Sequence, residues 1–154
     1  MPHKPFDKLT ESEFRQLEDA LALVTILIGS ADGEIDRKEI ASAVKLTHIR
    51  TYLEKNAMHE IYEDYANRIQ PRIEELLEEL PGDTRRRIQD VSDRLAKINP
   101  ILKKLDVATA TTIYKNLKSF ARHIASASGG FLGAFSISRE EEELLDLPML
   151  ERWP

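Results

Sequence analysis

The sequence predicts an all-α fold, and three observations lead to that class. Apolar side chains recur at three- and four-residue intervals over most of the chain, as on the buried face of a helix. Helix-capping pairs precede two of these segments: Thr10 with Glu13, and Asp36 with Glu39. No segment shows the two-residue alternation of a half-buried strand. We therefore expect a single compact bundle of about six to eight helices over residues 1–154.

The N-terminal third is predicted to form a helical hairpin. We expect residues 1–9 to be a flexible N-terminus, followed by a helix from about Glu11 to Ala31. The second half of that helix, ALALVTILIG, is apolar on nearly every side, whereas a surface helix carries charge on its outer face. It should therefore lie at the centre of the fold. The acidic corner DGEI then leads into a second helix that begins at Arg37 and ends between Thr47 and Asn56.

The middle of the chain alternates long helices with proline-marked breaks. A helix is expected over residues 57–80, where Pro71 should kink or split it because proline lacks an amide hydrogen. Apolar spacing predicts the next helix over residues 84–98. Asn99-Pro100 is then interpreted as a cap with a first-turn proline that restarts the chain. A long helix over about residues 108–127 follows.

The C-terminal part contains a loop, a short helix and an apolar tail. Residues 128–137 are expected to form a Gly/Ser-rich loop before a last helix at about residues 139–145. The final stretch DLPMLERWP is too apolar for a solvated tail, so it should pack along the domain; self-association through it is the alternative. Residues 26–40 and 124–144 share an order of features that suggests a degenerate internal repeat of helical hairpins.

Composition limits the possible functions. The chain has no cysteine, which excludes disulfides, thiolate metal sites and cysteine nucleophiles. The N-terminus lacks an apolar signal core and the longest uncharged runs are too short for a membrane span. We therefore expect a cytoplasmic protein that does not span a membrane.

Charge is unevenly distributed along the chain. Residues 54–80 hold 8 acidic and 3 basic side chains, residues 84–122 hold 3 acidic and 10 basic ones, and residues 139–154 hold 6 acidic and 2 basic ones. Such segregation predicts faces of opposite sign and selection of a protein partner by charge. Nucleic acid is the less favoured partner, because the net charge is 22 − 27 = −5 and few aromatic residues interleave the basic segment.

The acidic corner is the candidate metal site. Its sequence DGEIDRKE matches the closing two-thirds of a calcium-binding EF-hand loop, but Ile28 stands where the first ligand should be. The remaining hypothesis is that carboxylates of Asp32, Asp36 and Glu39 hold a divalent cation such as calcium, magnesium or manganese. The alternative is purely structural: Gly33 allows the turn, while Asp36 and Glu39 cap a helix.

Two segments carry a family resemblance. ALVTILIGSADGEIDRKEI resembles the first signature of TerB-like domains, the helical tellurite-resistance family that includes the N-terminal part of DjlA-type co-chaperones. SGGFLGAFSISREEEELL resembles the C-terminal signature of a bacterial branch of that family, although Ser128-Gly129-Gly130 replaces the expected aspartate. The resemblance implies an all-helical binding or sensing module in which acidic helix-start motifs meet around a cation or a partner. The resemblance implies this cation- or partner-binding role for Asp32, Asp36 and Glu39 of this sequence.

These observations lead to two functional hypotheses. The first is a non-enzymatic, stress-response, tellurite-resistance-associated module that binds a divalent cation at the acidic corner. The alternative is a docking or scaffold domain that uses its charged faces and has no metal site. Both expect a protein partner, for example a membrane-associated or chaperone complex. No nucleophile, base and orienting group occur in a pattern typical of an enzyme.

Overall fold

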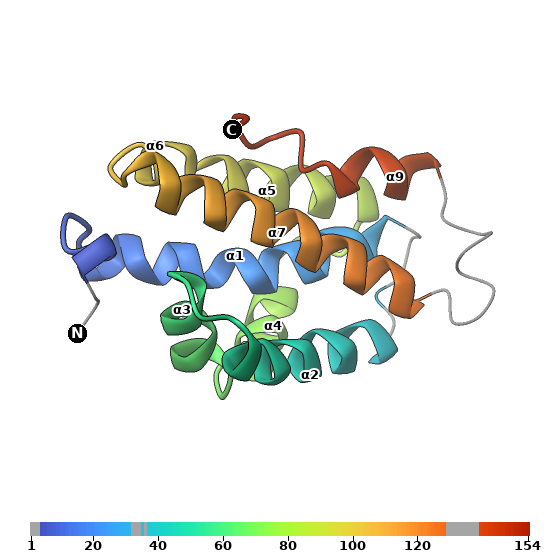
Figure 1. Ribbon diagram of the computed structural model, residues 1–154. Coiled ribbons are helices and arrows are strands. Elements are labelled where there is room, and N and C mark those ends of the chain that lie inside the picture. Colours follow the sequence, from blue (N-terminus) through green and yellow to red (C-terminus); the bar gives the residue numbers. More distant parts are fainter. Residues whose placement is uncertain (1–3, 32–34, 36, 129–138) are drawn as a thin grey trace.

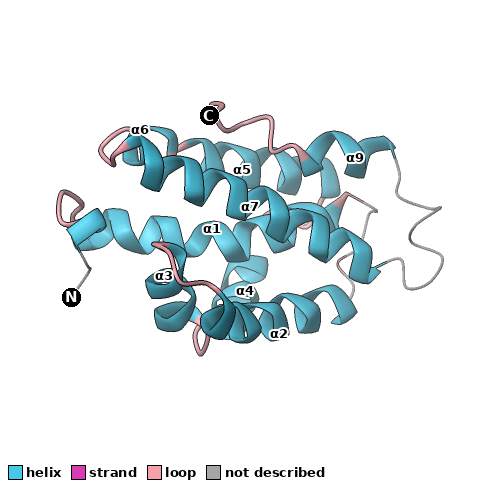
Figure 2. Cartoon of the chain, viewed as in Figure 1, coloured by secondary structure: helices cyan, strands magenta, loops and turns pink. Residues whose placement is uncertain are grey.

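The computed structural model describes residues 4–31, 35, 37–128 and 139–154. Within these ranges the chain forms helices and no strand, which confirms the all-α class there (Figure 2). The elements, in chain order, are η1 (Lys4–Phe6), α1 (Glu11–Ser30), α2 (Arg37–Leu53), α3 (Met58–Tyr65), α4 (Ile69–Glu79), α5 (Thr84–Ala96), α6 (Asn99–Leu102), α7 (Val107–Ser128) and α9 (Arg139–Leu145).

Helix α1 lies in the middle of the molecule, as its apolar sequence predicts. In Figure 1 it runs between α2, α3 and α4 on one side and α5, α6 and α7 on the other. Every residue from Ala20 to Ser30 is buried, so this half of the helix is covered on all sides. The predicted capping box is also present, because the Thr10 hydroxyl accepts from the Glu13 N–H at 3.1 Å and the Glu13 carboxylate accepts from the Thr10 N–H at 2.9 Å.

The remaining helix predictions are largely confirmed. Helix α2 begins at Arg37 as expected and continues to Leu53, which settles the end that the sequence left open. Helices α5, α7 and α9 agree with the expected segments to within two residues. Residues 129–138 lie outside the described residues. They include most of the expected Gly/Ser-rich loop and the turn of the second hairpin in the suggested internal repeat.

The expected helix over residues 57–80 is split into two, as one form of the prediction had it, but the expected position of the break at Pro71 is wrong. Helix α3 ends at Tyr65 and α4 begins at Ile69, so the break precedes Pro71. Pro71 is the third residue of α4, in the first turn, where backbone N–H groups have no intrahelical acceptor. Proline is therefore accommodated by starting a new helix just upstream of it.

The interpretation of Asn99 as a helix cap is also wrong. Ile98 occupies the N-cap position and Asn99 is the first residue of α6. Its side chain instead anchors the C-terminal tail: the amide nitrogen donates to the Met149 carbonyl at 3.0 Å, and the amide oxygen accepts from the Glu151 N–H at 2.9 Å. The polar side chain joins segments about fifty residues apart in sequence.

The N-terminus contradicts the expectation of a flexible segment over residues 4–9. Phe6 in η1 is 0 % exposed and Leu9 is buried. The Phe6 and Phe14 rings meet edge-to-face with centroids 5.1 Å apart, a favourable aromatic geometry. These contacts fasten the start of the described chain to the first turn of α1.

The apolar tail packs on the domain as predicted. Leu147 and Leu150 are buried, and Met149 and Trp153 pack partly against the core. Leu147 has a φ of 47°, a left-handed conformation that costs an L-residue roughly 1–2 kcal/mol, so its burial must outweigh this cost. Among the described helices, none combines the length and apolar character required to cross a membrane.

Candidate functional site

The structure describes one of the three predicted metal ligands. Asp32 and Asp36 lie outside the described residues, while Glu39 is the third residue of α2. Its side chain is 2 % exposed, an unusual environment for a carboxylate. A Cβ atom placed on Gly29 would lie 3.5 Å from the Glu39 carboxylate and 3.3 Å from Ile35. Gly29, which the sequence analysis did not single out, therefore lets α1 approach the start of α2 closely.

No metal centre is assembled within the described ranges. The residues placed there contain no group of three His, Asp or Glu side chains able to share an ion. Glu140 and Glu141, which resemble the second acidic motif, have side chains outside the described set. His59 pairs instead with Glu63, its neighbour one turn on, at 3.0 Å.

A basic side chain reaches the helix that leads into the acidic corner. Arg87 of α5 donates from Nε to the hydroxyl of Ser30, the last residue of α1, at 2.8 Å. Ser30 is buried and precedes Asp32 by two residues. The guanidinium thus places a positive charge at the end of α1. This contact between distant segments could not be read from sequence spacing.

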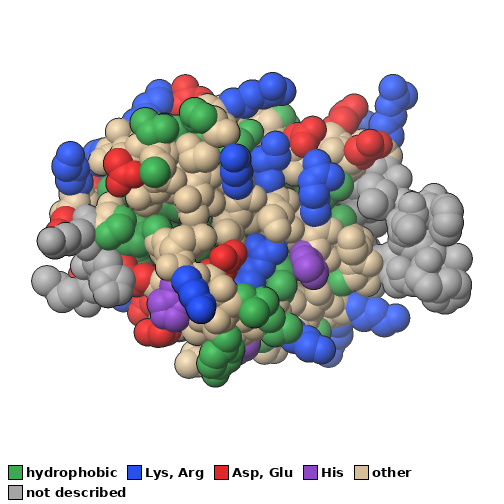
Figure 3. Space-filling view, in the orientation of Figure 1, with side chains coloured by type: hydrophobic (Ala, Val, Ile, Leu, Met, Phe, Trp, Pro, Cys, Tyr) green, Lys and Arg blue, Asp and Glu red, His purple; other side chains and the backbone are tan. Residues whose placement is uncertain are grey.

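A second candidate site lies between α7 and the C-terminal tail. We call it the α7–tail groove. It is lined by Tyr114, Lys115, Lys118, Ser119 and Arg122 of α7 and by Asp146, Arg152, Trp153 and Pro154 of the tail segment. In Figure 3, basic side chains gather on the upper part of the face that α7 and α9 present. Helix α7 supplies cations at successive turns, and the packed tail supplies the opposite wall.

Cations dominate the lining of the α7–tail groove. Two of its four cationic groups share one carboxylate, with Arg122 Nη2 at 3.3 Å and Lys118 Nζ at 3.8 Å from Asp146 Oδ1. The Lys118 ammonium also lies 5.2 Å from the centre of the Tyr114 ring, in cation–π geometry. Lys115 and Arg152 form no ion pair with any residue that the structure describes. The groove therefore carries excess positive charge beside aromatic rings.

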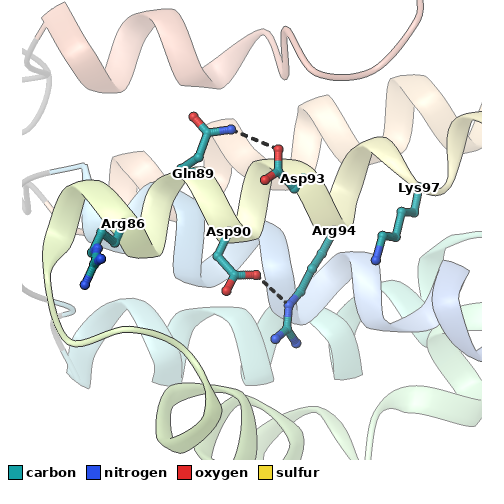
Figure 4. Close-up of a pocket in the computed structure, with 6 residues that line it drawn as sticks. All are labelled: Arg86, Gln89, Asp90, Asp93, Arg94 and Lys97. Atoms are coloured by element: carbon teal, nitrogen blue, oxygen red, sulfur yellow. Dashed lines mark hydrogen bonds and ion pairs between the residues drawn. The ribbon is translucent and has the colours of Figure 1, made fainter.

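The outer surface of α5 is charged too, and some of its side chains pair with one another. Figure 4 shows Asp90 accepting from Arg94 and Asp93 accepting from Gln89, both at 2.9 Å. Arg94 also lies 3.4 Å from Glu79 of α4. Alternating signs and internal pairing are typical of a solvated helix face. The long basic segment predicted from sequence is thus divided between α5 and α7, and each helix carries both paired and unpaired cations among the described residues.

Beneath α7 lies a buried polar network that sequence analysis missed. Arg50 of α2 is 8 % exposed, and its guanidinium donates to the Tyr62 hydroxyl, to Asn116 Oδ1 and to Ser119 Oγ at 2.8–2.9 Å. The Asn116 amide in turn donates to Glu54 at 2.9 Å. Burial raises the pKa of Tyr62 to about 12, so its hydroxyl stays protonated and polar rather than charged. The network fastens α2 and α3 to α7.

A second buried group lies between α1 and α3. The Glu18 side chain is 0 % exposed; its Oε1 accepts from Arg68 at 2.7 Å and from Arg15 at 3.2 Å. Burial, followed by the neighbouring Asp64 carboxyl, raises the pKa of Glu18 to about 8. The pKa of Asp64, which lies beside Glu18, Arg68 and Arg15, is lowered. At neutral pH Glu18 is therefore protonated, and its second oxygen, Oε2, is buried with no hydrogen-bond partner among the described residues.

Chemically, these arrangements differ in what they can do. The Glu18 carboxyl is inaccessible to solvent, so it cannot transfer a proton to a substrate. Its raised pKa is a consequence of its burial where α1 packs on α3. The α7–tail groove is open and positively charged, which suits recognition of an anion.

In comparisons with known proteins, no family model, no curated protein and no solved structure matches this chain.

Proposed function

We propose that this protein is a non-enzymatic docking module that binds an acidic protein partner through its charged surface. The observation that carries the proposal is the α7–tail groove, where four cations face one carboxylate. Two of these cations, Lys115 and Arg152, pair with no described residue. Surface cations without an ion-pair partner cost little folding free energy, because water solvates them. They favour encounter with a partner of opposite charge.

The non-enzymatic part of the proposal follows from where reactive groups lie. Glu18, whose pKa is raised to about 8, is fully buried between two helices. The α7–tail groove offers lysines and arginines whose charge is permanent near pH 7, together with one solvated aspartate. Such a set binds and orients anions but supplies no activated nucleophile with a base beside it.

Charge reversal in the α7–tail groove tests the proposal. A hexaglutamate peptide should bind the wild-type protein in a calorimetric titration, and its affinity should fall as salt rises from about 50 mM to about 200 mM. Lys115→Glu combined with Arg152→Glu should abolish binding. Arg85→Glu with Arg86→Glu on α5 is the matched control, since it changes the net charge equally outside the groove. Equal losses in both double variants would contradict a localised site.

A divalent-cation module of the TerB-like kind is the second candidate. It is favoured by the position of Glu39, an acidic side chain in the first turn of α2 that follows the sequence DGEID closely. In this proposal Asp32 and Asp36 complete the ligand set with calcium, magnesium or manganese. The tellurite-related stress role, and a membrane-associated or chaperone complex as partner, belong to the same proposal.

Titration with metal alone separates the two candidates. Calcium, magnesium and manganese chlorides are titrated into the wild-type protein and into Asp32→Asn/Glu39→Gln at fixed ionic strength. Saturable binding that is lost in this variant but kept in Glu74→Gln, an exposed residue of α4, supports the cation module. Absence of binding at millimolar metal would leave the corner as a turn and helix cap.

A further inference from the structure

The α7–tail groove already contains a carboxylate that belongs to the chain itself. Asp146 follows α9 directly and lies within ion-pair distance of both Lys118 and Arg122, two of the four groove cations. Its side chain is 64 % exposed, so the two ion pairs lie at the surface and not in the core. A carboxylate that enters the groove to pair with Lys118 and Arg122 would meet Asp146 there.

We propose that Asp146 is a built-in competitor, which an acidic polypeptide segment displaces from Lys118 and Arg122 when it docks in the α7–tail groove. This inference rests on the proposed docking function and adds the ligand class and its regulation. The first carboxylate of the segment takes the place of Asp146. A second carboxylate reaches Lys115 or Arg152, the groove cations without a described ion-pair partner.

Displacement of Asp146 is energetically accessible. Exposed ion pairs contribute little to stability, because water and salt screen them and because long side chains lose entropy when held. Arg122 is 61 % exposed, and the Lys118–Asp146 distance of 3.8 Å is close to the limit for an ion pair. The tail itself is held elsewhere, by Asn99 and by the buried Leu147 and Leu150. Release of Asp146 therefore need not unfold the tail.

The tail also carries a donor that its present contacts leave unused. The indole Nε1 of Trp153 is inaccessible to solvent and has no acceptor among the described residues. A buried N–H without an acceptor is unfavourable. A small movement of the tail as Asp146 is displaced would let this N–H meet water or a ligand oxygen. Trp153 lines the groove and is the only tryptophan of the chain, so its fluorescence reports on the site directly.

The test is a titration of hexaglutamate peptide followed by Trp153 fluorescence, in wild type and Asp146→Asn. Removing a competing carboxylate worth one or two exposed ion pairs should tighten binding by about twofold to tenfold. Asp93→Asn is the matched control, because it removes the same charge from α5 outside the groove. Its affinity should stay near that of wild type. Asp146→Ser is the second variant: if it unfolds at the wild-type temperature and also binds the peptide more tightly, a folding defect in Asp146→Asn does not explain the gain in affinity.

The outcomes separate the inference from the function on which it rests. Binding that depends on Lys115 and Arg152 but is unchanged in Asp146→Asn overturns the competitor role and leaves the docking function standing. Equal tightening in Asp93→Asn also overturns it, since net charge then explains the gain. No response from wild type or from Asp146→Asn overturns both. A response to inorganic phosphate at equal ionic strength, with none to the peptide, overturns the polypeptide ligand.

Discussion

Replacing Glu18 by glutamine should make this protein less sensitive to alkaline pH. Glu18 is fully buried; Oε1 accepts from Arg15 and Arg68, and the pKa of Glu18 is raised to about 8 by burial and then by the neighbouring Asp64. A glutamine has nearly the same shape as the protonated acid. Its carbonyl can accept from the two arginines, as Oε1 of the acid does, and its NH₂ takes the place of the protonated Oε2. The substitution therefore keeps the neutral form and removes the titration.

The sign and size of the effect follow from linkage. Because the folded pKa is raised from 4.5 to about 8, the folded state holds this proton more tightly than the unfolded state. The resulting stabilisation is fully present below pH 4.5 and is lost as the pH rises to about 8. A pKa difference of about 3.5, at about 1.4 kcal/mol per pKa unit, sets an upper limit of about 5 kcal/mol. Roughly 2–3 kcal/mol of this should be lost between about pH 6 and about pH 9.

The measurement is urea denaturation followed by circular dichroism at several values between about pH 6 and about pH 9. The difference in unfolding free energy between Glu18→Gln and wild type should grow in favour of the variant as the pH rises. Glu74→Gln, on the exposed face of α4, is the control and should track the wild type. Parallel curves for wild type and Glu18→Gln would refute the reasoning, because Glu18 would then titrate alike in both states.

Three further predictions concern contacts between distant segments. Arg50→Met should cost about 3 kcal/mol of unfolding free energy, because it removes the buried guanidinium that donates to Tyr62, Asn116 and Ser119; denaturant unfolding measures it, and a loss below about 0.5 kcal/mol would contradict a stabilising network. Asn99→Ala should cost about 1–3 kcal/mol and red-shift the tryptophan emission as the tail loosens; an unchanged spectrum would argue against the anchor. Phe6→Ala should cost about 3–5 kcal/mol through its lost burial against Phe14, whereas a truly flexible N-terminus would give no effect in thermal unfolding.

The helix starts were predictable because their signals are local. Thr10 and Glu13 satisfy backbone N–H groups within one turn, and the same hydrogen bonds are present in the structure. The central position of α1 was also predictable, since a helix with no charged side in its second half has no face to present to water. Breaks were harder. Pro71 correctly indicated an interruption, but the position of the break depends on how α3 and α4 pack around it.

The candidate sites show where local reasoning ends. Spacing along the chain singled out Asp32, Asp36 and Glu39, of which the structure describes Glu39 alone, as a buried side chain close to Gly29. Spacing along the chain did not indicate that Arg87 would donate to Ser30, which is 57 residues away in sequence. Basic character over residues 84–122 was visible in the composition. Which of those charges are compensated was not, because the pairing partners come from other helices and from the tail.

The sequence by itself therefore determined the helical class, the starts of most helices, the burial of α1 and the packing of an apolar tail. Each of these depends on periodicity, capping or hydrophobicity within a few residues. Tertiary structure alone decided that Asn99 anchors the tail, that Glu18 is buried against Arg15 and Arg68, and that Asp146 meets Lys118 and Arg122. These depend on distances across the fold, where the electrostatic environment of a side chain is set by neighbours that are remote in sequence.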